Sequence, residues 1–158
     1  MSSWRQWRAL APDERRKLVQ AAALLVYARL RLPFIGFRAD LDAVQRAGST
    51  ELPAIALQRA QLVSRLVAIA AGHSPVRVSC LHRSLVLWWL LRREGIPCEL
   101  RLGARTDTGE FEAHAWVRCA GVALDQQPAE LARYRPFGEA VLPVGRAGRW
   151  RFALRRAG

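Results

Sequence analysis

The sequence contains little lysine, and its positive charge comes from arginine. Lys17 is the only lysine among 25 basic residues, and the formal net charge is +12. The arginines are spread along the chain, without a glycine-rich RNA-binding motif, a zinc finger or a basic arm. The charge therefore does not by itself indicate nucleic acid, and we expect no nucleic-acid partner. An acidic peptide or protein would fit the charge equally well.

Long apolar runs are also missing. The longest one near the N-terminus, residues 21–28, is far shorter than the roughly 20 residues that span a bilayer. Nor does the N-terminal stretch read as a secretory signal. Cysteine is scarce as well: the three cysteines cannot all pair within the chain, which favours free thiols in a reducing compartment. We therefore expect a cytoplasmic protein with no transmembrane segment.

The first part of the chain shows helical patterns. Residues 12–14, Pro-Asp-Glu, suit a helix start, where proline and acidic side chains are favoured. Apolar residues follow at helical spacing and predict one buried face: Leu18, Ala22 and Leu25. Pro33 is expected to break this helix.

A second apolar segment predicts another helix before residue 73. Ser49 and Thr50 are candidate caps at its start, and Gly72 is the expected C-cap. Its predicted apolar stripe consists of Leu62, Leu66 and Ile69.

The segment "VSCLHRSLVLWWLLRREGIP", residues 78–97, predicts a third helix. Ser79 can cap its start, and Gly95 marks its end. Trp88, Trp89 and the leucines leave little room for a polar face, so we expect this helix to be buried on most sides.

The pattern then changes to strands. Residues 98–104 alternate in polarity, and residues 111–125 read as two strands around a tight turn. Helices followed by an antiparallel sheet predict an α+β fold, with a central helix packed on the sheet. We expect a single domain over residues 1–158, with a helical subregion at 1–72 and a catalytic core at 73–158.

Cys80 is the candidate nucleophile. A thiol must lose its proton to attack, and the free N–H groups and dipole of a helix N-terminus favour the thiolate. Cys80 lies at such a start, whereas Cys98 opens a strand and Cys119 is expected in the turn. A lone cysteine in an apolar segment can equally be a core residue, so the cysteine alone does not decide.

His114 and Asp125 are the candidate partners of this thiol. If the hairpin turns through Cys119 and Ala120, His114 faces Asp125 directly. A turn through residues 120–121 instead places Asp125 opposite Trp116, on the same face as His114. Either register brings a carboxylate within reach of the imidazole, which gives the parts of a cysteine protease or acyltransferase.

Zinc binding is the rival chemistry for these side chains. Five cysteines and histidines could be combined into a site on paper, but none of the closely spaced Cys-Cys pairs typical of zinc sites is present. We therefore expect neither a metal nor another cofactor.

The segment "CLHRSLVLWWLLRREGI…ELRLGA…FEAHAWVRCAGVALD" closely resembles the leader peptidase, or B protein, of lasso peptide biosynthesis. That family belongs to the transglutaminase-like, papain-related superfamily. The shared pattern is a Cys-Leu-x-Arg-Ser/Ala-Leu helix start, a Leu-Leu-x-Arg-x-Gly-Ile helix end and a Phe-x-Ala-His-Ala-Trp-Val strand. The motifs occur here together and in the same order.

The resemblance implies that Cys80 is the nucleophile, His114 the base and Asp125 its orienting carboxylate. It implies a cysteine peptidase that removes the leader from a ribosomal precursor peptide, before an ATP-dependent, asparagine-synthetase-like cyclase closes the ring. The region before Cys80 shows no strands for a RiPP recognition element, so the split form fits, with a separate recognition protein as partner. The alternatives are a non-catalytic peptide-binding or chaperone member of the superfamily and an amine acyltransferase.

Overall fold

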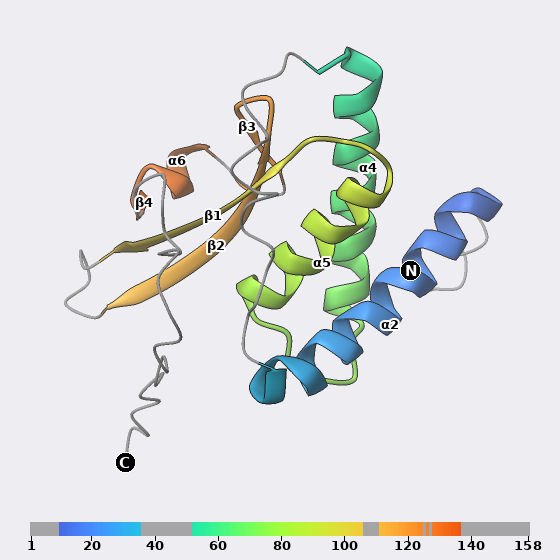
Figure 1. Ribbon diagram of the computed structural model, residues 1–158, viewed down its shortest axis with the longest axis horizontal. Coiled ribbons are helices and arrows are strands. Elements are labelled where there is room, and N and C mark those ends of the chain that lie inside the picture. Colours follow the sequence, from blue (N-terminus) through green and yellow to red (C-terminus); the bar gives the residue numbers. More distant parts are fainter. Residues whose placement is uncertain (1–9, 36–51, 106–110, 125, 127, 137–158) are drawn as a thin grey trace, which may run out of the picture.

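A computed structural model describes residues 10–35, 52–105, 111–124, 126 and 128–136, with side chains excluded at 31–35. The expected α+β fold is confirmed. The order of elements is α2 (Pro12–Ile35), α4 (Ala54–Gly72), α5 (Cys80–Arg93), β1 (Glu99–Arg105), β2 (Glu112–Cys119), β3 (Val122–Ala123), α6 (Pro128–Leu131) and β4 (Arg135–Pro136). In Figure 1 the three long helices gather on one side of the sheet, and α6 and β4 lie at its far edge.

Helix α2 begins as the sequence predicts. Pro12 is its first residue, and the carboxylate of Glu14 accepts a hydrogen bond from the backbone N–H of Ala11 at 2.8 Å. Leu25 is fully buried, as predicted for this face. The prediction that Pro33 ends the helix is wrong, since α2 continues to Ile35. A proline this close to the C-terminus disturbs only the last turn.

Helix α4 differs from the predicted stripe. Leu66 is buried, but Ile69 is exposed, and the helix begins after Pro53 rather than at Ser49 or Thr50. It ends at Gly72 with His73 as C-cap. The buried face is made by small and branched residues that pack closely on α2 and α5: Ala60, Val63, Val67 and Ala70.

Length and composition would also let α4 cross a membrane, and it is the one described helix that meets both criteria. Such a helix is weak evidence for a membrane span, because core helices of soluble proteins have the same length and composition. In this fold α4 contributes its buried face to the core shared with α2 and α5.

Helix α5 supplies the centre of the core. Leu91 is fully buried, and Val86, Leu87 and Leu90 are at most 5% exposed. The expectation of burial on most sides is wrong at Trp89, which is 37% exposed and lies under the guanidinium of Arg93. The sheet, α2 and α4 pack on the other sides of α5, and Trp89 lies on the side that they leave exposed.

The sheet is antiparallel, in the order β3-β2-β1-β4. Strand β1 pairs with β2 so that Gly103 faces His114, and with β4 so that Gly103 faces Pro136. Strands β2 and β3 pair Cys119 with Val122, which places the turn at residues 120–121. Both turn residues have positive φ angles, 46° and 81°, as a two-residue hairpin turn of the primed kind requires.

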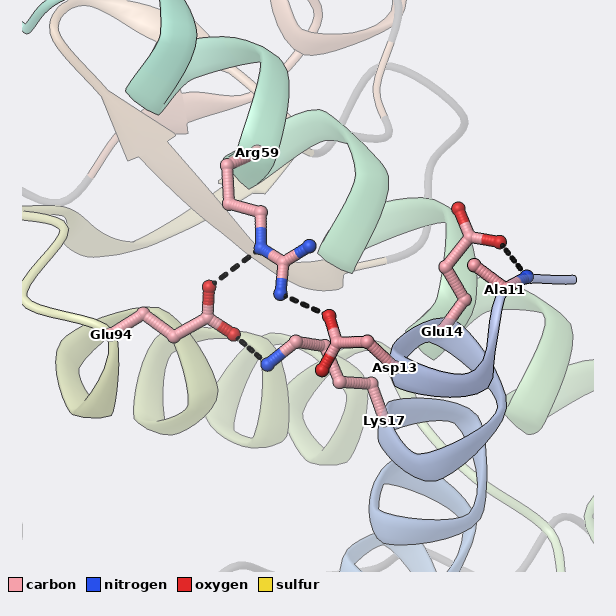
Figure 2. Close-up of polar contacts among 6 residues, drawn as sticks. All are labelled: Ala11, Asp13, Glu14, Lys17, Arg59 and Glu94. Atoms are coloured by element: carbon pink, nitrogen blue, oxygen red, sulfur yellow. Dashed lines mark hydrogen bonds and ion pairs between the residues drawn. The ribbon is translucent and has the colours of Figure 1, made fainter.

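A group of four charged side chains, which we name the helix cluster, joins α2, α4 and the end of α5: Asp13, Lys17, Arg59 and Glu94. Figure 2 shows Arg59 between the carboxylates of Glu94 and Asp13, at 2.9 and 2.7 Å. Lys17 binds the other oxygen of Glu94. Charges at the ends of three separate elements therefore hold the helices in one arrangement.

Candidate active site

Cys80 is the first residue of α5, and Ser79 is the N-cap. The Ser79 hydroxyl accepts the backbone N–H of His82, as the sequence predicts for a capping residue. The N–H groups of the first helical residues have no partner within the helix. The thiol of half-buried Cys80 therefore lies beside backbone donors that favour negative charge.

His82 completes this cap. Its Nδ1 accepts the backbone N–H of Ser79 at 3.3 Å and lies 2.6 Å from the Ser79 hydroxyl. Burial, followed by the positive charge of Arg29, lowers the pKa of His82, which favours the neutral ring that can accept these bonds. The histidine nearest to Cys80 in sequence thus holds the helix start.

Cys80 and His114 border the same cavity, although they lie on different elements. The cavity has a volume of about 30 Å³, enough for a water molecule, and is lined by residues of α4, α5, β2 and the segment after β3. Arg83 also borders it, as does Gln126. The fold therefore brings together two of the three side chains proposed from the sequence.

The third, Asp125, lies outside the described residues. The observed turn at 120–121 is one of the two registers considered above, the one that pairs Arg118 with Ala123. The backbone N–H of Leu124 also bonds the carbonyl of Val117 at 2.9 Å. The role of Asp125 as orienting carboxylate stays a prediction.

Two buried polar atoms at the cavity have no hydrogen-bond partner among the described residues, Nε2 of His114 and Oγ of Ser64. Ser64 comes from α4 and is 3% exposed. Both residues line the cavity that Cys80 borders.

A third serine fixes the position of the helix against the sheet. Ser84 lies one turn after Cys80, and its buried hydroxyl donates to the carbonyl of Ala115 at 2.9 Å. Ala115 directly follows His114 on β2. This bond therefore sets the distance between the cysteine helix and the histidine strand.

The ring of His114 contacts two aromatic side chains. The Trp116 ring is nearly parallel to it at 6.1 Å, and the Tyr134 ring lies 4.9 Å away at an angle of 30°. Gly103 faces His114 across β1 and β2. A Cβ atom at Gly103 would lie 2.9 Å from Trp116, so the glycine leaves room for these rings.

The other two cysteines are buried at 2% and 0% exposure, and Cys119 ends β2 rather than lying in the turn as expected. Hydrogen bonding with Cys119, together with burial, raises the pKa of the Cys98 thiol. A buried, protonated thiol is a poor nucleophile, which leaves Cys80 as the accessible one. No cluster of metal-binding side chains occurs in the described part of the chain.

Sequence reasoning missed Ser64, Ser84 and Tyr134. The serines lie within apolar helical stretches, where a small polar residue at a buried position is the only available signal. Tyr134 lies in a proline-containing segment whose path over the sheet no periodicity could indicate.

The comparison with protein families agrees with this geometry. The model of the transglutaminase-like superfamily matches residues 22–139, about three quarters of the chain. No curated protein and no solved structure matches the chain significantly. Catalysis in this superfamily usually depends on a cysteine, and a cysteine at a helix start shares the cavity with His114. The chain belongs to the transglutaminase-like superfamily.

Proposed function

We propose that this protein is a cysteine peptidase that removes the leader from a ribosomal lasso-peptide precursor before cyclisation. It acts with a separate leader-recognition protein and an ATP-dependent, asparagine-synthetase-like cyclase. The observation that carries the proposal is the shared cavity of Cys80 and His114. The lasso assignment rests on the motif resemblance around these two residues.

The chemistry follows from the positions of the two side chains. The Cys80 thiolate attacks the scissile carbonyl, and the backbone N–H of Cys80 donates to the oxyanion. His114 gives a proton to the leaving amine, which departs as the C-terminal product and leaves the leader as a thioester. His114 then takes a proton from water, and the hydroxide cleaves the thioester. The Cys80 thiolate leaves, and His114 keeps the proton, so the starting state of both side chains is restored.

The chain's net positive charge supports an acidic partner, either the leader itself or the recognition protein that carries it. Since attraction between exposed charges is screened by salt, we expect binding of the leader complex to weaken from low to moderate ionic strength. Unchanged affinity over this range would contradict docking by charge.

Cleavage of a precursor by the purified protein, with recognition protein and cyclase present, tests the function. Cys80→Ala and His114→Ala should abolish the leader fragment seen by mass spectrometry while circular dichroism stays unchanged. His73→Ala is the matched control, because His73 is exposed and its ring bonds the carbonyl of Ile69 in its own helix end. Normal cleavage by Cys80→Ala would exclude the peptidase.

The mass of the leader product separates the alternatives. A leader ending in a free carboxylate indicates hydrolysis, and one that carries an added primary amine indicates acyl transfer. Iodoacetamide should label Cys80 before Cys98 and Cys119, because only Cys80 is accessible. Equal, slow labelling of all three, without cleavage, would favour a non-catalytic peptide-binding protein.

A further inference from the structure

Three side chains beside His114 form a second polar group, which we name the sheet cluster: Arg105, Glu112 and Tyr134. The Tyr134 hydroxyl donates to Oε1 of Glu112 at 2.8 Å, and Arg105 Nε donates to Oε2 at 2.8 Å. The Arg105 guanidinium also lies 5.0 Å from the centre of the Tyr134 ring. Each member thus contacts the other two.

The sheet cluster holds the aromatic ring of Tyr134 in place from both ends. Tyr134 directly precedes β4, whose backbone pairs with β1 at Gly103 and Ala104. Its hydroxyl is held at the other end by Glu112, which is two residues before His114 on β2. The ring between these two attachments is the one that packs at 4.9 Å on the imidazole of His114.

The carboxylate adds charge to this geometry. Hydrogen bonds from Tyr134 and then Arg105 lower the pKa of Glu112, and the nearby charges of Arg105 and His114 act in the same direction. Glu112 is therefore ionised at neutral pH and can accept hydrogen bonds from Tyr134 and Arg105 at the same time.

We infer that Tyr134 and Glu112 are positioning residues for His114: the ring sets the orientation of the imidazole, and the carboxylate holds the ring in place. The inference rests on the proposed role of His114 as base. The described contacts of the His114 ring are those with Trp116 and Tyr134. Among the described residues, the charged or titratable groups near His114 are Cys80 and Arg83 at the cavity, and Arg105, Glu112 and Tyr134 at the ring.

Three substitutions test separately the Tyr134 ring, its hydrogen bond to Glu112 and the charge of Glu112. Tyr134→Ala removes the ring, Tyr134→Phe removes only the bond to Glu112, and Glu112→Gln removes the charge. Tyr27→Phe and Glu99→Gln are matched controls: Tyr27 is the other tyrosine, on α2, and Glu99 is a strand carboxylate paired with Arg101.

The first readout is the titration of the His114 ring by NMR, assigned by its loss in His114→Ala. Tyr134→Ala and Glu112→Gln should each change this titration relative to wild type, because the contact that orients the imidazole is lost or loosened. The second is the rate of Cys80 alkylation by iodoacetamide near neutral pH. It should fall about threefold in Tyr134→Ala and Glu112→Gln, because a misoriented imidazole activates the thiol less well. Tyr134→Phe should lie between these variants and wild type.

Unchanged His114 titration and unchanged alkylation in folded Glu112→Gln and Tyr134→Ala would overturn the inference. Glu112 is exposed, so its variant remains informative even if Tyr134→Ala does not fold. Precursor cleavage separates this inference from the function. If cleavage is lost on substitution of Cys80 or His114 but is unchanged on substitution of Tyr134 or Glu112, only the positioning role is overturned. Shifted titration and alkylation in a protein that cleaves no precursor support the positioning role and contradict the peptidase.

Discussion

The helix cluster and the sheet cluster both pair arginine with glutamate, but the two clusters have different roles. In the helix cluster, Arg59 and Lys17 meet Glu94 at the junction of three helices, and their ion pairs in the described part of the chain involve neither Cys80 nor His114. In the sheet cluster, Arg105 and Glu112 hold a tyrosine ring against His114. The first stabilises a packing arrangement, whereas the second controls the surroundings of one imidazole.

Burial explains the difference in their contributions to stability. The Glu94 side chain is 20% exposed and meets two cations, whereas that of Glu112 is 47% exposed. Exposed ion pairs contribute little to folding, and partly buried ones that satisfy several groups contribute more. The two regions should therefore respond to mutation in opposite ways, one in stability and the other in reactivity.

The largest expected effect lies beside the sheet cluster. Gly103→Ala places a Cβ atom 2.8 Å from the carbonyl oxygen of Arg135 and 2.9 Å from Trp116. Strand β4 or the tryptophan must shift, at a cost of about 1–3 kcal/mol in the free energy of unfolding, measured by denaturant titration. Because β4 carries Tyr134 to His114, alkylation of Cys80 should slow as well.

Gly72→Ala in α4 is the control for this change. Nothing lies within 4 Å of a Cβ atom there, so alanine should be neutral or stabilise the helix by up to about 1 kcal/mol. Equal losses of unfolding free energy in Gly103→Ala and Gly72→Ala would show that the close approach at Gly103 does not determine stability.

Glu94→Gln and Glu112→Gln test the comparison directly. Burial opposes the ionisation of Glu94, but the hydrogen bonds from Lys17 and Arg59 outweigh it and lower its pKa. Losing this carboxylate should cost about 1–2 kcal/mol and leave Cys80 alkylation unchanged. Glu112→Gln should slow alkylation and leave the unfolding free energy nearly unchanged. The reverse pattern would contradict the division of roles.

The same Glu94 bonds predict an acid dependence. A carboxyl whose pKa is lower in the folded state stabilises the protein above its unfolded pKa, near 4.3, and this stability is lost as the pH falls through the folded value. The Glu94→Gln variant should therefore lose less stability than wild type between pH 5 and pH 3, as followed by thermal melting.

Local signals made the α5 start and the hairpin predictable from the sequence. Ser79 before an apolar helix and a glycine at the turn act through short-range geometry, so they predict structure without knowledge of the fold. The approach of Cys80 and His114 to one cavity was predictable only as a pattern of residue types, since no periodicity measures the distance between a helix and a strand.

Tertiary packing decided the features that the sequence did not predict. Ile69 fits a helical stripe as well as Val67 does, yet only Val67 faces α2 and α5. Trp89 is apolar but lies on the side of α5 that the sheet, α2 and α4 leave exposed. Tyr134 reaches His114 because β4 folds back onto β1. A strand of only two residues carries no sequence pattern from which this long-range pairing could be predicted.

Two buried serines around the cavity offer a smaller test. Ser84→Ala leaves the carbonyl of Ala115 without its partner and should cost about 1 kcal/mol. Ser64→Ala removes a hydroxyl with no partner among the described residues, so it should be neutral or slightly stabilising. Equal destabilisation, measured by denaturant titration, would mean that Ser64 binds something in the folded protein.

The smallest effect is expected at the cap of α5. The folded state lowers the pKa of His82, so it prefers the neutral ring. That preference stabilises the protein above the unfolded pKa near 6.5 and is lost as the pH falls through the folded value. His82→Gln keeps the capping-box pattern without a titrating group. Its melting temperature should fall less than that of wild type from pH 7.5 to 5, whereas the exposed His73→Gln should follow wild type. Identical pH profiles for wild type and His82→Gln would show that the cap does not depend on a neutral His82.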